Sequence, residues 1–419
     1  MFSVNDLTTV KETLFRLEKK VEYLNYEGFD PYDVKGHSFF MWALALPRHP
    51  FYMNIFRKLI LGPLVIGEYL FPKFFRIIFM VKPKKNAKGI GLFVKGYLNL
   101  YQVTGNELWL NKAISLLDWL IENKSKGYKH YCWGYPFNWD NFEVIPAYTP
   151  ASVVSAAVFD AFWHAWLVTG EKRYLNVCSE IALFFIEYLN ITEINENTIC
   201  FSYTPLDHLQ VHNTNLMVAD CLLKVGYAES NDKFLLYGKK AANFALLEQN
   251  KDGSIFYYGS AQNYINPNRV DHYHSGFEIR CLLNIWKTTK DVSFLKAYQS
   301  YYEFYLKNFI FKKEDFYFPF MYPNKLYPIN IHSCAESIIL NAELASLDER
   351  AIDILDKVTI SVISKMIRKD GMFKFMIQKF GSLEVSSNIA YMRWGQAWMF
   401  LALSEYLLRV TQIKPEFKF

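Results

Sequence analysis

The sequence lacks the residues and motifs that mark several common protein classes. Its 419 residues include only 6 cysteines and no CxxC pair, so we expect free thiols in a reducing cytoplasm. Only 19 glycines and 15 prolines are present, which excludes a collagen-like chain, and the 52% share of hydrophobic residues excludes a disordered one. Walker A, GxGxxG and G-x-S-x-G patterns are missing, so phosphate-loop, Rossmann and hydrolase-elbow chemistries have no support.

Membrane-targeting signals are scarce as well. Residues 1–27 contain neither the apolar stretch nor the small-residue cleavage site of a signal peptide. In the basic segment described next, the longest uncharged apolar run covers residues 59–67, far short of the roughly 20 residues of a membrane span. We therefore expect no transmembrane helix and a cytoplasmic protein.

Positive charge is concentrated in one segment. The formal charge of the chain is +5, but residues 51–88 carry eight basic residues and one acidic residue, which leaves −2 for the rest. Aromatic and aliphatic residues alternate with these cations, as in segments that lie on anionic membranes. We expect an excursion at about 51–88 that contacts the inner face of the inner membrane through Arg57, Lys58, Lys73, Arg76, Lys82, Lys84 and Lys85. The alternative is a segment whose apolar side packs on the body of the protein and whose lysines are only solvated. We expect no nucleic-acid partner, because the basic residues are confined to this one segment.

From residue 88 onward the chain repeats a helix–turn–helix pattern. Polar turns near residues 105, 170, 231, 290 and 348 follow one another at intervals of 58 to 65 residues, within similar sequences such as YQVTGNELWLNKA and AWLVTGEKRYLNV. Such fixed-period similarity indicates repeated αα-hairpins. Five hairpins, a C-terminal helix and an amphipathic N-terminal helix would close an all-α (α/α)6 toroid, with residues 1–419 as a single domain. An open solenoid is the competing architecture.

Long connections at about 125–148, 191–212, 249–273, 309–332 and 368–391 occupy the same place in every repeat, so they should gather at one end of the ring as a funnel. The helices that follow them begin with polar residues. His274 and Glu278 lie four residues apart, as do His332 and Glu336, so each pair shares a helix face. A histidine beside a carboxylate is suited to proton transfer near neutral pH. Hydrogen-bonded pairs on a helix surface are the structural alternative.

Aromatic residues are abundant in the same connections. The stretch YCWGYPFNWD, at 131–140, alternates aromatic side chains, which could pack on the body or stack against sugar rings in the funnel. A metal site built from Asp271, His272, His274, His332 and Cys334 was weighed as well. No HExxH or CxxC ligand pair supports it, so neither a metal nor another cofactor is expected.

Five motifs carry a resemblance to a known group of proteins: GFDPYD at 28–33, WGYPFNW at 133–139, DHYHSGFE at 271–278, NIHSCAE at 330–336 and YMRWGQAW at 391–398. In this order they resemble bacterial surface-polysaccharide-cluster proteins of the six-hairpin toroid superfamily of glycosidases, lyases and epimerases. The resemblance covers most of the chain and is weakest near 51–85. It implies a glycan substrate. The Trp motif of that group commonly continues with an acid where this chain has Asn138, so a catalytic role at that position is in doubt.

The resemblance implies an enzyme that acts on a uronate-containing or lipid-linked glycan in the biosynthesis or processing of capsule, O-antigen or exopolysaccharide. Within that class, the residue types favour proton abstraction, as in a lyase or an epimerase. A glycoside hydrolase with an Asp/Glu pair, a non-catalytic glycan-binding subunit at the inner membrane, and a zinc-dependent toroid prenyltransferase are the alternatives. The candidate catalytic residues are His212, His274, Glu278, His332, Glu336, Tyr391 and Arg393. The candidate substrate-binding residues are Asp30, Trp133, Tyr135, Trp139, Asp140, Asn213, Asp271, Trp394 and Gln396.

Overall fold

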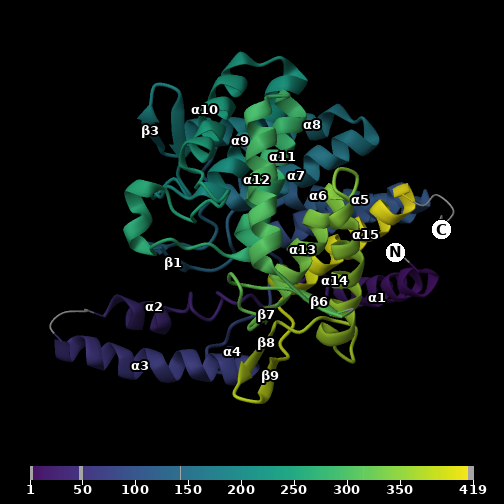
Figure 1. Cartoon of the computed structure of the whole chain (residues 1–419). Coiled ribbons are helices and arrows are strands. Elements are labelled where there is room, and N and C mark those ends of the chain that lie inside the picture. Colours follow the sequence, from purple (N-terminus) through teal and green to yellow (C-terminus); the bar gives the residue numbers. More distant parts are fainter. Residues whose placement is uncertain (1–2, 47–50, 142, 315, 414–419) are drawn as a thin grey trace.

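The computed structural model describes residues 3–46, 51–141, 143–314 and 316–413. Within them, six helices form an inner ring in which each helix packs against the next (Figure 1). They are α5 (Ala87–Thr104), α7 (Ser152–Thr169), α9 (His212–Glu229), α11 (His272–Thr289), α13 (Ile331–Leu344) and α15 (Trp398–Ile413). The ring is closed because α15 packs against α5. The expected (α/α)6 toroid is therefore confirmed, and the open solenoid is excluded.

An outer helix covers each inner one. These helices are α6 (Glu107–Glu122), α8 (Lys172–Tyr188), α10 (Asp232–Glu248), α12 (Val292–Phe309), α14 (Glu349–Met366) and α1 (Val4–Tyr23). The amphipathic α1 buries Leu7, Val10, Leu14, Leu17 and Val21 and packs against α15 and α14. The N-terminal helix is thus the partner of the C-terminal one, as the sequence pattern predicts.

The repeated turns follow from helix-capping chemistry. Gly105 and Gly170 end α5 and α7 in the left-handed conformation, with φ of 66° and 72°, a region open to glycine at little cost. Four of the five helices that follow these turns begin after a residue whose side chain accepts a backbone hydrogen bond, namely Asn106, Asn231, Asp291 and Asp348, whereas the side chain of Glu171 before α8 makes no such capping bond. This capping explains the similar sequence around each turn.

Short antiparallel hairpins occupy the long connections, next to the N-terminal ends of the inner helices. They pair β1 (Trp139–Asn141) with β2 (Glu143–Ile145), β3 (Ile191–Asn195) with β4 (Thr198–Phe201), and β5 (Ile310–Lys313) with β6 (Phe316–Pro319). A three-stranded sheet has the order β7 (Ile329–Asn330), β8 (Met376–Phe380), β9 (Leu383–Ser387). Two short helices, η1 (Ser260–Ile265) and η2 (Met392–Ala397), complete these connections, and η2 leads directly into α15.

The basic segment forms a separate arm of helices. Figure 1 shows α3 (Phe51–Leu70) extending beyond the ring alongside α2 (Ser38–Ala45), with α4 (Pro72–Ile78) returning toward the body. Arg76 of α4 is only 1% exposed, and its guanidinium forms ion pairs of 2.7 Å with Asp33 and 3.2 Å with Glu68. The prediction that Arg76 faces a membrane is therefore wrong, because the side chain anchors the arm to the toroid.

One helix among the described residues, α7, is long and apolar enough to cross a membrane. This corrects the expectation that no helix would meet that criterion. Slightly more than half of α7 is buried, and it packs between α5 and α9 in the inner ring. Its apolar composition is that of a core helix enclosed by neighbours.

Candidate active site

A cavity of about 390 Å³ lies at the funnel end of the ring. One position recurs in its lining. In each repeat, the second residue of the helix that follows the long connection lines the cavity. These six residues are Lys88, Val153, Asn213, Tyr273, His332 and Arg393. Five of these residues are the second residue of an inner helix, and Arg393 is the second residue of η2, the short helix that leads into α15. The shared position in the repeat therefore brings one side chain from each repeat to the cavity.

Eight of the candidate residues meet in this cavity: Tyr135, Trp139, Asp140, Asn213, His274, His332, Arg393 and Trp394. Tyr135 and Trp139 come from the loop before β1 and from β1 itself, and their rings meet edge to face at 6.1 Å. Aromatic walls with a few convergent polar groups are typical of small-molecule and sugar sites. The sequence thus located much of the cavity, while the catalytic and binding roles of its residues stay predictions.

His274 is held in one orientation by a carboxylate. Its Nδ1 lies 2.8 Å from a carboxylate oxygen of Asp271, the N-cap residue of α11. Burial alone would raise the pKa of Asp271, but interactions with His274 and Arg269 outweigh it and lower the pKa to about 2. Burial lowers the pKa of His274, so its imidazole is neutral near pH 7. The ionised Asp271 fixes Nδ1 as the protonated nitrogen and leaves Nε2 as a base facing the cavity.

His332 is packed between aromatic rings, and no polar side chain or backbone group of the described residues hydrogen-bonds its ring. Its ring stacks on Tyr273 at 4.6 Å and on Trp398 at 4.7 Å. Burial first, and then the charges of Lys88 and Arg393, hold its pKa well below the usual range. Both ring nitrogens are buried and have no hydrogen-bond partner among the described residues. Buried nitrogens without a hydrogen-bond partner lower the stability of the fold unless a ligand or water binds them. We therefore expect His332 to contact the ligand of the cavity.

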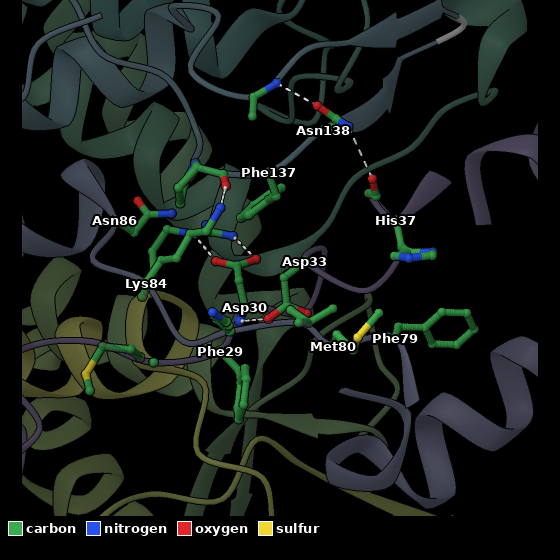
Figure 2. A pocket seen from close by; sticks show the side chains of 18 residues that line it. Phe29, Asp30, Asp33, His37, Phe79, Met80, Lys84, Asn86, Phe137 and Asn138 are labelled. Carbon is green, nitrogen blue, oxygen red and sulfur yellow. Dashed lines mark hydrogen bonds and ion pairs between the residues drawn. The ribbon is translucent and has the colours of Figure 1, made fainter. Parts of the chain in front are cut away.

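Arg393 connects the cavity to a neighbouring one. Its guanidinium makes a bidentate pair with Asp30, at 2.5 Å and 2.8 Å, and also lies 4.9 Å from the ring centre of Tyr135. Asp30 lines the second cavity, of about 400 Å³, rather than the funnel (Figure 2). Asp30 therefore lies outside the funnel, where its carboxylate orients Arg393, and its role in substrate binding stays a prediction.

Lys88 and Arg269 line the funnel but are not among the candidate residues, since the sequence pattern assigns Lys88 only to the basic segment. The side chain of Lys88 is 4% exposed. Burial, reinforced by repulsion from Arg393, lowers the pKa of Lys88 to about 7. The ammonium lies 5.6 Å from the ring centres of Phe277 and Trp398, and no carboxylate pairs with it among the described residues. Its place one residue after the start of an inner helix is the signal that would have revealed it.

Four predicted catalytic residues lie outside the cavity: Glu278, Glu336, His212 and Tyr391. Glu278 and Glu336 follow His274 and His332 by four residues, so each lies about 6 Å deeper along its helix. Glu278 accepts a 2.6 Å hydrogen bond from Tyr301, and burial raises its pKa well above the usual range. Glu336 pairs with Arg280 at 3.2 Å, and burial raises its pKa to about 7. His212, the first residue of α9, turns toward α10 and lies 3.2 Å from Glu248.

Tyr391 and two predicted substrate-binding residues, Trp133 and Gln396, make structural contacts, and Asp271 acts on the funnel indirectly. Tyr391 lies outside the funnel and hydrogen-bonds Glu68 at 3.2 Å beside the Arg76 anchor. Trp133 is 1% exposed and donates to the carbonyl of Leu120. Gln396 is fully buried and clamps the backbone of Phe373 through both amide atoms. Asp271 does not line the cavity itself and acts on it through His274 and Arg269.

The charge of the funnel is predominantly positive. Lys88, Arg269 and Arg393 line it, while the single carboxylate on its wall, within the described residues, is that of Asp140 at the exposed rim. Asn138, the position where an acid would be expected from the resemblance, uses its amide to bridge Gly36 and Ala147. No group of three metal-ligating side chains occurs in the described part of the chain.

Solved structures of other proteins share this architecture. No family model and no curated protein matches the sequence. Solved structures do match: a sugar epimerase from a ruminal bacterium (13% identity, 79% of this chain and 88% of that one, TM-score 0.58) and an unsaturated glucuronyl hydrolase specific for heparin (13%, 78% and 86%, TM-score 0.54). A polysaccharide lyase is similar at 12% identity, over 78% of this chain and 90% of that one, with a TM-score of 0.53. At such low identity the likeness concerns the fold alone, and the chain has the (α/α)6 toroid fold of these six-hairpin proteins.

Proposed function

We propose that the protein is a carbohydrate-active enzyme that abstracts a proton next to the carboxylate of a uronate-containing glycan, as a lyase or an epimerase. One observation carries the proposal: two neutral histidines, His274 and His332, line a cationic, aromatic-walled cavity whose described lining residues include no pair of facing carboxylates. The epimerase, hydrolase and lyase character of the similar structures adds support.

The side chains that line the cavity include a group for each step of this reaction. The substrate carboxylate fits between the cations Lys88, Arg269 and Arg393, which stabilise negative charge as it develops on that group. Nε2 of His274 takes the proton from the adjacent carbon, and the ionised Asp271 stabilises the imidazolium that forms. In an epimerase, a proton must return to the opposite face of the carbon. We assign this step to His332, which is neutral in the resting protein and therefore has to take a proton from water before it can deliver one. In a lyase, the leaving oxygen takes a proton from a phenol such as Tyr257, whose pKa is raised by burial.

Hydrolysis is less well supported. It requires two carboxyl groups flanking the glycosidic bond, roughly 5 to 9.5 Å apart. Asp30 and Asp271 are both engaged in ion pairs, and neither lines the funnel. Asp140 alone lacks a second carboxylate opposite it among the described lining residues.

The test uses uronate oligosaccharides in deuterated water. Epimerisation would place solvent deuterium in the recovered sugar, and a lyase would produce an unsaturated product that absorbs in the ultraviolet. His274→Gln and His332→Gln should abolish either signal, while the exposed His208→Gln serves as the matched control. New reducing ends without deuterium or unsaturation would replace the proposal by hydrolysis. Binding without any turnover would replace it by a glycan-binding subunit.

We also propose that the glycan belongs to a bacterial surface polysaccharide or its lipid-linked precursor, handled in the cytoplasm. The six cysteines, all free and buried, are compatible with a reducing compartment. Fractionation of the native cells tests this location, and recovery of the protein from the periplasm would refute it.

A further inference from the structure

The outer face of α3 carries a continuous apolar stripe. Tyr52, Phe56, Leu59, Pro63, Ile66 and Leu70 follow one another in steps of three or four residues and are all exposed. The five non-proline members are between 48% and 68% exposed, although their side chains are large and apolar. Steps of three and four place residues on one side of a helix, so the stripe runs along the whole length of α3, about 30 Å.

The apolar surface continues over α4. Phe71, Phe74 and Ile77 are 58% to 74% exposed, again at three-residue steps. Soluble monomers rarely leave so large an apolar patch in water. We call the outer faces of α3 and α4 together the platform.

The charges around the platform have one sign. Lys58, Lys73, Lys82 and Lys84 are exposed, whereas Glu68, the only acid between residues 51 and 88, is 9% exposed and pairs with Arg76. Apolar side chains at the level of acyl chains, with lysines reaching anionic headgroups, are the composition of a helix that lies in a membrane interface.

We propose that the platform docks on the surface of an anionic phospholipid bilayer, with α3 lying in the membrane plane. Spanning is disfavoured because Arg57, Lys58 and Glu68 would all enter the hydrocarbon. A second copy of the chain on this face would bring two sets of lysines together without opposing carboxylates. The bilayer is the partner that satisfies both the apolar stripe and its cationic border.

The contacts that attach the platform to the toroid determine which part of the toroid lies near the membrane. Arg76 joins α4 to Asp33, Glu68 and the carbonyl of Asp30. The cavity of about 400 Å³ seen in Figure 2 lies at this junction, and Phe79 and Met80 line it together with Asp30. Docking therefore holds this cavity, and the funnel beside it, near the membrane surface. The proposal stands independently of the reaction proposed for the funnel.

Flotation of the full-length protein with vesicles tests the proposal. We expect binding to vesicles of phosphatidylglycerol and phosphatidylcholine and about tenfold weaker binding to phosphatidylcholine alone. The double variant Phe56→Ser, Ile66→Ser should lose binding about tenfold or more, because both side chains leave the acyl region. Its matched control is Leu236→Ser, Leu247→Ser on α10, at the opposite end of the molecule in Figure 1, where the leucines are 54% and 55% exposed.

The charge contribution has its own pair of variants. Lys58→Glu, Lys73→Glu should remove the preference for anionic vesicles, while Lys239→Glu, Lys251→Glu, also exposed, should retain it. Circular dichroism confirms that each variant is folded. The proposal is overturned if the wild-type protein does not float, if it binds both vesicle types equally, or if platform and control variants float alike. Concentration-dependent dimers that the Phe56→Ser, Ile66→Ser variant abolishes would overturn it in favour of self-association.

Discussion

Replacing Lys88 by methionine should stabilise the fold while it removes a cation from the funnel. Lys88 is 4% exposed and has no carboxylate partner among the described residues, so at acidic pH the folded state must bury an unpaired ammonium. Methionine has a similar length and no charge. The variant therefore tests directly whether the lysine is as strained electrostatically as its surroundings imply.

The magnitude follows from the lowered pKa of Lys88, about 7 against a usual 10.5. Because the unfolded chain binds the proton more tightly, the penalty on folding is greatest below pH 7 and fades as pH rises toward 10.5. It amounts to about 5 kcal/mol at about pH 6 and about 2 kcal/mol at about pH 9. At the lower pH, loss of the cation–π contacts with Phe277 and Trp398 offsets about 1 kcal/mol of this gain. The net gain should be about 4 kcal/mol at about pH 6 and about 2 kcal/mol at about pH 9, where Lys88 is already neutral and no cation–π contact is lost.

Urea unfolding of both proteins at the two pH values measures this difference. In thermal unfolding, a gain of about 4 kcal/mol corresponds to about 4 to 5 °C for a chain of 419 residues. Lys239→Met, at an exposed position, should show no pH-dependent gain. Equal stability of wild type and Lys88→Met at both pH values, or a variant that is less stable at about pH 6, would refute the reasoning.

Three further outcomes follow from buried charges. Asp30→Ala should cost about 3 to 5 kcal/mol in urea unfolding, because Arg393 stays buried without its partner; if Asp30→Ala, Arg393→Met is no more stable, the ion pair is not the cause. Arg76→Met should leave the ring folded but release α3, which limited proteolysis would detect as early cleavage there; unchanged cleavage would contradict the anchoring role. Asp271→Asn should lower kcat about a hundredfold or more in the deuterium-exchange assay, with little effect on KM, because His274 loses its fixed tautomer. An unchanged kcat would show that Asp271 and His274 do not act together in the reaction.

The candidate residues separate by their position in the helix. His332 and Arg393 are second residues of their helices and line the funnel, and His274 joins them one residue further along. Glu278 and Glu336 share faces with the histidines, as the four-residue spacing predicts, but one turn deeper, where the ring is packed and closed. The spacing therefore identified the face correctly and could not give the depth.

The sequence by itself determined the helical repeat, the ring and the end at which the funnel opens, because these depend on periodic apolar positions and on capping residues that act locally. Only the tertiary structure decided which polar residues meet. A shift of one position turns a side chain by about 100°, which separates His212, facing α10, from Asn213, facing the cavity. Lys88, which the sequence assigns to the basic segment, lies in the funnel because it is the second residue of α5. Closure of the ring around it buries its side chain.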